Sequence, residues 1–248
     1  HTTTPFGAGL ATATDSLAAI KKAVFEDKSV CMDELLHALD TDFEGMEGEK
    51  IRQKLLATPK FGNDDDYVDE FARFLTDTFM KEVETYESGR GGHLVGGFFT
   101  LSSTVPLGHE TPATPNGRKA RTPISDSVSP TNGVEENGPT AVLNSAAKID
   151  HSRCAAGNAV NIKFSPGALE SAGKLEKFAN LITAYLIDMH GFEVQINVVS
   201  ADTLRAAQKN PAEYRDLIIR IAGYSARFVE LAPDIQEDLI TRTEHQMV

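Results

Sequence analysis

The stretch RIAGYSARFVEL, residues 220–231, is the most informative part of this chain of 248 residues. An apolar run, LIIRIA, leads into Gly223, and a second run rich in aromatic and aliphatic residues follows it. A lone glycine after such a run is commonly a turn or the end of a helix, because glycine adopts left-handed backbone conformations readily. Glycine also lacks a Cβ, so its α-carbon can lie close to other backbone.

The neighbouring residues favour a more specific interpretation than a turn. Residues 220–231 resemble the radical-bearing loop of the glycyl radical enzymes, and the resemblance continues through DLII at 216–219 and QEDLITRTEH at 236–245. In that family the central glycine, here Gly223, stores an unpaired electron on its α-carbon. Without a Cβ this carbon can become planar and share the spin with both flanking amides. The resemblance implies a catalytic Gly223 and support for its loop from Arg220, Tyr224, Ser225 and Phe228, with Tyr224 and Phe228 shielding the radical from water and oxygen.

Two further segments carry the same resemblance. The Pro/Gly/Asn/Ser-rich residues 115–145, beginning PNGRKA, resemble the long loop and helix that precede the radical domain. GFEVQINVVS, residues 191–200, resembles the strand that runs up to the radical loop. The likeness therefore covers essentially the whole chain.

Hydrophobic spacing indicates an α/β fold that is rich in helices at its N-terminal end. Helices are predicted over residues 14–26, 32–39, 49–57, 65–86, 140–149, 171–190, 201–208 and 233–245. Strands are predicted over residues 98–105, 159–164, 192–199 and 217–222. Alternating strands and helices favour parallel pairing. Residues 106–138 carry most of the turn residues and are predicted to be a long ordered loop, in which Arg118 and Lys119 are expected to be solvated charges.

The resemblance implies that the complete protein is a barrel of ten strands in two half-barrels. This chain would be its C-terminal portion: residues 1–125 would complete the barrel domain and residues 126–248 would form the glycyl radical domain. Residues 7–17 resemble the interior of the family's sequence rather than its beginning. We therefore expect either a fragment or one subunit of a divided enzyme.

A cysteine is the second residue that the family's chemistry requires, because the glycyl radical oxidises a cysteine whose thiyl radical attacks the substrate. In the dehydratase and lyase branch that cysteine lies in a Gly-Cys-x-Glu loop, and neither Cys31 nor Cys154 has this context. Both are expected to be ordinary thiols. The catalytic cysteine would lie in a remaining N-terminal part or in a separate subunit.

Composition excludes several classes of function. The net charge of −12 makes a nucleic-acid or anionic-membrane surface improbable, and no apolar run is long enough to span a membrane. Two cysteines are too few for a disulfide framework, which favours a reducing compartment. The seven histidines show no metal-ligand spacing, so no metal site is predicted. The expected location is the cytoplasm, or a bacterial microcompartment within it.

The resemblance favours a glycyl radical lyase or dehydratase that cleaves a C–O, C–N or C–S bond of a small substrate in anaerobic metabolism. Hydroxyl groups of Thr100, Ser102 and Ser103 are candidates for substrate binding. No cofactor is expected to stay bound. The radical would be installed by a separate activating enzyme that uses S-adenosylmethionine and an iron–sulfur cluster, and the enzyme would be a homodimer.

Other functions remain open from the sequence. Arylacetate decarboxylases, enzymes that add hydrocarbons to fumarate, and acyltransferases of the pyruvate formate-lyase type share these motifs. A non-catalytic alternative is a radical-carrying accessory subunit that docks onto a damaged enzyme. A helix-rich binding domain with a fortuitous glycine loop is the third alternative.

Overall fold

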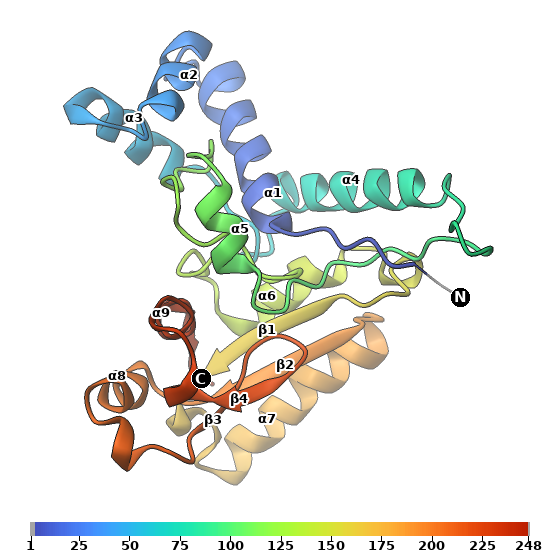
Figure 1. The fold of residues 1–248 in the computed structure, drawn as a ribbon, viewed down its shortest axis with the longest axis vertical. Coiled ribbons are helices and arrows are strands. Elements are labelled where there is room, and N and C mark those ends of the chain that lie inside the picture. Colours follow the sequence, from blue (N-terminus) through green and yellow to red (C-terminus); the bar gives the residue numbers. More distant parts are fainter. Residues whose placement is uncertain (1–2, 248) are drawn as a thin grey trace.

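The computed structural model describes residues 3–247 of the chain. Its N-terminal part is helical, as predicted (Figure 1). Helix α1 (Leu10–Ala19) continues directly into a π-helical segment (Ile20–Glu26), and α2 (Met32–Asp40), α3 (Gly45–Leu56) and α4 (Asp66–Val83) follow. The four predicted N-terminal helices are therefore confirmed, although the first begins at Leu10 rather than at residue 14.

Local capping and burial explain where these helices begin and how they pack. Cys31 caps α2 in a reciprocal pair of hydrogen bonds with Glu34, and the Asp65 carboxylate caps α4 by accepting from the Tyr67 N–H. A separate small core joins the end of α1, the π-helical segment, α2 and α3, and includes Leu35, Phe43 and Leu55. The rest of α1 packs into the core beside the sheet. Helices α2 and α3 stand apart from the sheet in Figure 1.

The segment after α4 differs most from its prediction. Residues 98–105 do not form a strand: Gly97 and Phe98 make single bridges, residues 101–103 form a turn, and α5 (Thr104–Glu110) begins immediately afterwards. The β-type composition was misleading because Leu101 has a positive φ of 54° and Pro106 falls in the first turn of α5, where proline is tolerated. Tertiary contacts override strand propensity here.

The predicted loop of residues 106–138 is present apart from α5, but Arg118 is not a solvated charge. Its side chain is buried, and its guanidinium donates to the carbonyls of Thr111, Pro112, Lys119 and Thr122. A guanidinium has five N–H donors in a fixed planar arrangement, so Arg118 can bind several carbonyls at once and hold the turns of its own loop together. Lys119 is exposed, as expected.

The second half of the chain is built on a parallel sheet. Helix α6 (Gly138–Ala147) leads to β1 (Ala159–Phe164), and α7 (Ala172–Thr183), extended by a π-helical segment (Ala184–Asp188), connects it to β2 (Glu193–Val198). Strand β1 pairs in parallel with β2 and with β5 (Glu244–His245), giving the order β2-β1-β5. The predicted parallel pairing is confirmed, as are the strands predicted over residues 159–164 and 192–199, which are β1 and β2. The main hydrophobic core lies between this sheet, α4, α6 and α7.

The chain forms a smaller unit after β2 and before β5 in the sequence. It contains α8 (Ala201–Lys209), β3 (Ile218–Arg220), β4 (Ser225–Arg227) and α9 (Pro233–Thr241), and it has its own apolar core. Strands β3 and β4 form an antiparallel hairpin, of which only β3 was predicted. The helix predicted over 233–245 is too long: α9 ends at Thr241, because the next residues turn back to pair with β1 as β5.

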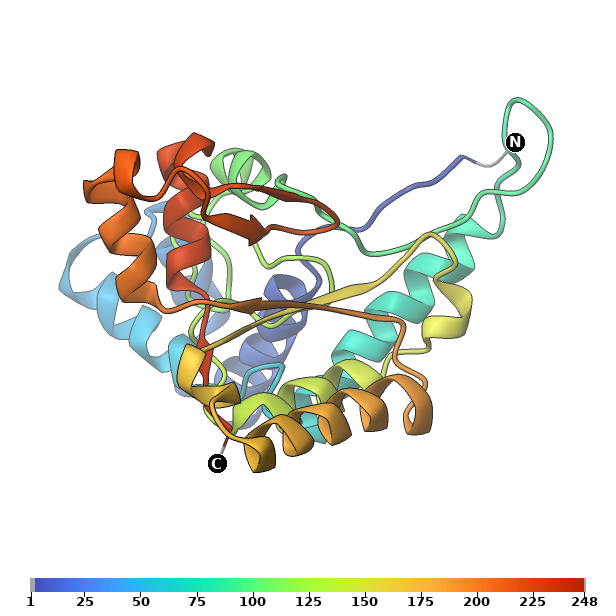
Figure 2. The same ribbon diagram turned by 90° about the horizontal axis from the view of Figure 1, so that it is seen from below.

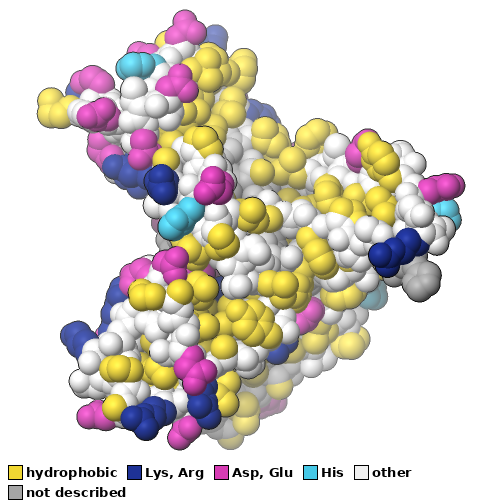
Figure 3. All heavy atoms as spheres, viewed as in Figure 1, with side chains coloured by type: hydrophobic (Ala, Val, Ile, Leu, Met, Phe, Trp, Pro, Cys, Tyr) yellow, Lys and Arg dark blue, Asp and Glu magenta, His cyan; other side chains and the backbone are white. Residues whose placement is uncertain are grey.

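The two faces of the sheet carry different partners. Figure 2 shows α7 on one side of β1 and β2 and the β3–β4 hairpin on the other. Apolar side chains gather on the face that carries the hairpin in Figure 3. Ile218 and Tyr224 of the hairpin region, Leu101, and Leu107 of α5 are all exposed. Within residues 3–247, no helix is both long and apolar enough to cross a bilayer.

Candidate active site

Gly223 lies at the tip of the β3–β4 hairpin. Arg220 pairs with Ser225 at the end of the ladder, and the Ile221 N–H donates to the Tyr224 carbonyl at 2.9 Å to close the turn. Gly223 has a φ of +78°, in the left-handed region that costs residues with a Cβ free energy. The tight turn therefore requires glycine at this position.

One face of the Gly223 α-carbon is covered by side chains from a distant loop. A Cβ built on Gly223 would lie 2.3 Å from Cε1 and 2.4 Å from Cζ of Phe99, and 3.2 Å from Cδ2 of Leu101. Both residues belong to the segment that was predicted to be a strand. They were missed as site residues because nothing in residues 98–105 indicates contact with the hairpin.

The amide of Gly223 is held by a side chain from the sheet. Its N–H donates to Oε1 of Gln195 at 2.8 Å, and the same oxygen accepts from Nε of Arg220 at 3.0 Å. Gln195 is buried in β2 and its Nε2 donates to Glu193 Oε1 at 2.6 Å. Asn197 lies two residues after Gln195 in β2. Its side chain accepts from the backbone N–H of Arg220 at 2.9 Å and donates to the backbone carbonyl of Arg220 at 2.6 Å.

The four residues expected to support the loop lie in different surroundings. Arg220 contacts Gln195, as described, and its guanidinium lies 4.0 Å from the Glu193 carboxylate. Ser225 is exposed in β4, and Tyr224 is exposed at the tip of the hairpin. Phe228 is fully buried in the small core of the unit, with Val199, Leu204 and Ile221 among its members.

A buried ionic cluster anchors the base of the hairpin. Arg242 Nη1 donates to the Ile221 carbonyl at 3.0 Å, and its Nη2 lies 3.4 Å from carboxylate oxygens of both Asp126 and Asp238. Burial raises the pKa of Asp238, and the nearby Arg242 guanidinium opposes that rise. All three side chains are at least nine-tenths buried, and Arg242 is the cation that pairs with both carboxylates. The cluster connects the long loop, α9 and the hairpin.

The candidate substrate hydroxyls lie on the loop that covers Gly223. Thr100 is buried, and its hydroxyl donates to the Asp126 carboxylate. Ser102 and Ser103 are partly exposed, and neither hydroxyl makes a hydrogen bond within the described residues. Thr100 is therefore engaged inside the chain, whereas the two serines are accessible; substrate contact by all three stays a prediction.

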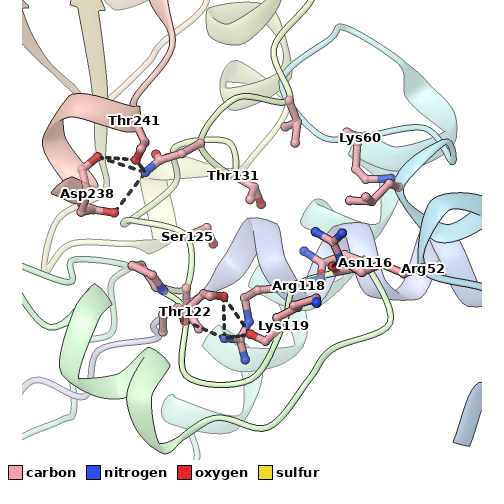
Figure 4. Close-up of a pocket in the computed structure, with 16 residues that line it drawn as sticks. Arg52, Lys60, Asn116, Arg118, Lys119, Thr122, Ser125, Thr131, Asp238 and Thr241 are labelled. Carbon is pink, nitrogen blue, oxygen red and sulfur yellow. Dashed lines mark hydrogen bonds between the residues drawn. The ribbon is translucent and has the colours of Figure 1, made fainter. Parts of the chain in front are cut away.

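A separate cavity lies between α3, the loop of residues 116–125 and α9 (Figure 4). Its volume is about 350 Å³, and Gly223, Gln195 and Phe99 do not line it. On its wall Asn132 donates to Asp238 Oδ1 at 3.0 Å, and burial lowers the pKa of Lys60 to about 8. Asp238 also belongs to the cluster with Arg242, so the cavity borders the base of the hairpin but not its tip.

Two cysteines and seven histidines complete the inventory of reactive side chains. Cys154 is buried in the main core, where burial raises the pKa of its thiol, and Cys31 is exposed at the start of α2. His151 is buried, with Nε2 2.9 Å from the Ala146 carbonyl. Within residues 3–247 no three His, Cys, Asp or Glu side chains are placed to hold a metal ion.

Family comparisons agree with the geometry around Gly223. Residues 1–108 match the family model described as pyruvate formate lyase-like, and residues 124–229 match the model described as glycine radical. Together these two models cover most of the chain, including the hairpin. The chain belongs to the glycyl radical enzymes. The family resemblance read from the sequence is therefore confirmed, and the relatives named below are lyases and dehydratases.

Individual relatives of this glycyl radical protein are similar over nearly its full length. Isethionate sulfite-lyase of Bilophila wadsworthia is 45% identical over 97% of the chain. The glycerol-bound B12-independent glycerol dehydratase from Clostridium butyricum superposes with a TM-score of 0.95 at 44% identity, over 99% of the chain. Hydroxyproline dehydratase from Clostridioides difficile, with trans-4-hydroxy-L-proline bound, gives 0.94 at 41% over 99%.

The chain covers only part of these relatives. It spans 29% of the sulfite-lyase and 31% of each of the two dehydratase structures. It corresponds to their C-terminal portion, a mixed α/β segment whose N-terminal part is rich in helices.

Proposed function

We propose that this chain carries the radical of a glycyl radical dehydratase or lyase, and that the radical resides on Gly223. The observation that carries the proposal is the environment of this residue at the hairpin tip. Its α-carbon is packed against Phe99 and Leu101, while its N–H is held by Gln195. A stored carbon radical needs an α-carbon free to become planar, flanking amides that are held in place and exclusion of water. Gly223 lacks a Cβ, its N–H is held, and Phe99 and Leu101 exclude water from one face of the α-carbon.

The chemistry proposed for Gly223 is the transfer of one hydrogen atom. The glycyl radical takes the hydrogen of a cysteine S–H, which restores Gly223 and leaves a thiyl radical on sulfur. The thiyl radical then takes a hydrogen atom from a substrate carbon that bears a hydroxyl group. The neighbouring C–O, C–N or C–S bond breaks, the leaving group departs with the bonding electron pair and the hydroxyl gives up its proton, which leaves a carbonyl group beside a carbon radical. The product radical recovers hydrogen from the same S–H, and the radical returns to Gly223, so no electron is gained or lost over the cycle.

The complete protein is proposed to have the architecture that the resemblance implies. Residues 1–125 would be the C-terminal part of the barrel domain, and residues 126–248 would be the glycyl radical domain. The cysteine loop would come from the part of the protein that corresponds to the remaining two-thirds of the relatives. Ser102 and Ser103 are candidates for contact with a small hydroxyl-bearing substrate. The exposed apolar side chains beside the hairpin support burial of this face in the complete protein.

The biological setting is part of the same proposal. A separate activating enzyme with S-adenosylmethionine and an iron–sulfur cluster would remove the hydrogen atom from Gly223. The complete protein would act as a homodimer in anaerobic metabolism, in the cytoplasm or in a bacterial microcompartment. The match of residues 124–229 to the glycine radical model supports the need for activation.

Electron paramagnetic resonance tests the proposal on the complete protein, with its cysteine-bearing portion present. After anaerobic activation we expect a doublet, because one hydrogen remains on the radical carbon. Growth on glycine deuterated at the α-carbon should collapse this doublet, which identifies a glycine without any substitution. Mass spectrometry after exposure to air should then find cleavage at Gly223. A doublet with cleavage at another glycine would reassign the site, and no signal from a folded, activated protein would refute the function.

A further inference from the structure

We propose that Gln195 is the positioning residue of the radical site: its side-chain oxygen fixes the amide plane of Gly223 and so sets the geometry in which the radical is stored. This inference rests on the proposed function and adds a residue to it. Gln195 lies 28 positions before Gly223 in the sequence and reaches it only because β2 runs beneath the hairpin.

The orientation of the Gln195 amide is determined by its three partners. The Gly223 N–H and the Arg220 Nε–H can only donate, so the group facing them is the oxygen. On the other side, Nε2 lies 2.6 Å from a Glu193 carboxylate oxygen, which accepts. A flipped amide would place donors against donors and an oxygen against a carboxylate. Gln195 is also only 4% exposed, so water does not compete for these contacts.

The position of Gln195 is fixed by the sheet. Side chains alternate along a strand, so Glu193, Gln195 and Asn197 share the face of β2 that meets the hairpin. The backbone of β2 is already paired with β1, where Gln195 stands opposite Asn161. Strand β2 therefore holds the hairpin through side-chain amides: Asn197 binds the backbone of Arg220, and Gln195 binds the backbone of Gly223.

This hydrogen bond acts on the part of the loop that would share the unpaired electron. Delocalisation onto the amide nitrogen requires the plane of that amide to stay aligned with the planar radical carbon. An acceptor in line with the N–H resists rotation of the amide. Its partial negative charge also favours electron donation from nitrogen toward the electron-poor carbon. Arg242, which binds the Ile221 carbonyl, fixes the chain two residues earlier.

The test compares two variants of the complete, activated protein. Gln195→Leu removes the acceptor and leaves the partly buried Gly223 N–H without this partner. The double variant Glu193→Gln/Gln195→Glu exchanges donor and acceptor between positions 193 and 195, keeps the net charge, and retains an oxygen for Gly223 and Arg220. Asn197→Leu is the matched control, because it removes two hydrogen bonds from the same strand face to the same hairpin but none to Gly223.

The readout is the radical itself rather than activity alone. Electron–nuclear double resonance in H₂O and D₂O measures the coupling of the exchangeable Gly223 amide proton. In Gln195→Leu we expect an altered, broadened coupling and turnover per radical about fivefold lower, the size expected for loss of one ordinary hydrogen bond. The double variant should restore a narrow coupling. Asn197→Leu should lower the melting temperature while leaving the coupling of the radicals that form unchanged.

Two results would overturn the inference. One is a Gln195→Leu spectrum identical to that of the unsubstituted protein, with unchanged turnover per radical. The other is an Asn197→Leu spectrum altered as much as that of Gln195→Leu, which would assign the effect to docking of the hairpin. Failure of the proposed function is distinguishable from both, because the unsubstituted protein would then show no glycyl doublet.

Discussion

The phenyl ring of Phe99 occupies the space in which a side chain on Gly223 would lie, with 2.3 Å between Phe99 Cε1 and the position of such a Cβ. The two residues are 124 positions apart in the sequence, and they meet where the loop after Phe98 passes the hairpin tip. The same loop also joins the ionic cluster, since Thr100 donates to Asp126. Phe99 therefore covers Gly223 from a loop that is itself anchored by a buried contact.

Gly223→Ala is expected to abolish the radical and to distort the hairpin. The left-handed φ of +78° alone costs an alanine about 1–2 kcal/mol, and the overlap with Phe99 adds to this. Hydrogen exchange of the amides in β3 and β4 should become faster, and the glycyl doublet should be absent.

A double variant separates the steric effect from the chemical one. Phe99→Ala in the Gly223→Ala background removes the overlap, so hydrogen exchange should slow toward that of the unsubstituted protein. The glycyl doublet should stay absent, because no glycine remains at the tip. A doublet in the double variant would place the radical elsewhere.

Phe99→Ala in the presence of Gly223 is expected to leave radical formation possible and to shorten the life of the radical. Removing the ring admits water and oxygen to one face of the α-carbon. Phe99 is only partly buried, so the loss of stability should be about 1–3 kcal/mol, below that of a fully buried phenylalanine. Decay of the doublet under limited oxygen measures the effect. Phe99→Leu should be intermediate, and equal decay in all three proteins would contradict the shielding role.

Arg242→Met is expected to destabilise the protein by about 3–5 kcal/mol, because it leaves the buried carboxylates of Asp126 and Asp238 without their cation. Chemical denaturation measures the loss. Neutralising both carboxylates in the same variant, with Asp126→Asn and Asp238→Asn, should recover part of it.

Arg205→Met is the control for removal of an arginine from this region. Arg205 pairs with Glu237, but both side chains are more than two-fifths exposed, so little stability should be lost. Equal destabilisation by the two substitutions would show that burial of the Arg242 cluster is not the cause.

The stability that depends on His245 should fall as the pH is lowered from 6.5 toward 4. Burial, with a smaller contribution from Lys163, lowers the pKa of His245 from 6.5 to about 4. The unfolded chain then binds a proton in this window that the folded chain does not, so acid favours unfolding, by up to about 1.4 kcal/mol per pH unit. His245→Asn should reduce the slope of stability against pH between 4 and 6.5. An unchanged slope would show that folding does not lower the pKa of His245. Asp15 contributes in the opposite direction, because burial raises its pKa to about 7, so the difference between the two proteins is the quantity to compare.

Much of the fold could be predicted because local sequence and tertiary structure agree. Apolar residues at helical spacing give α2 and α4 nearly their observed bounds, and the β-branched run at residues 159–164 matches β1. The hairpin was predicted only up to Gly223, because β4 contains Ser225, Ala226 and Arg227, which have no strand pattern. Strand β5 is too short for any periodicity.

The candidate site was predicted only at its centre. Gly223 could be found from the residues around it, but its contacts come from segments that are distant in the sequence. Phe99 belongs to a run that resembles a strand, Gln195 to a strand that resembles any half-buried one, and Arg242 to the end of a helix. The sequence shows which residues stand at these positions, but it does not indicate that they contact the hairpin, because the tertiary fold brings them there.

The strand order β2-β1-β5 determines which substitutions can move the hairpin. Strands β2 and β5 both pair with β1, at Phe164 with Val198 and at Lys163 with Glu244. Residues 199–243, which include the hairpin, connect β2 to β5. Both ends of this segment are therefore held by neighbouring residues of the same strand, β1. A substitution that shifts β1 would therefore displace both ends of the segment that carries the hairpin tip. A substitution in a turn within that segment would not displace both ends. For this molecule, distance along the sequence from Gly223 is a poor measure of influence on it.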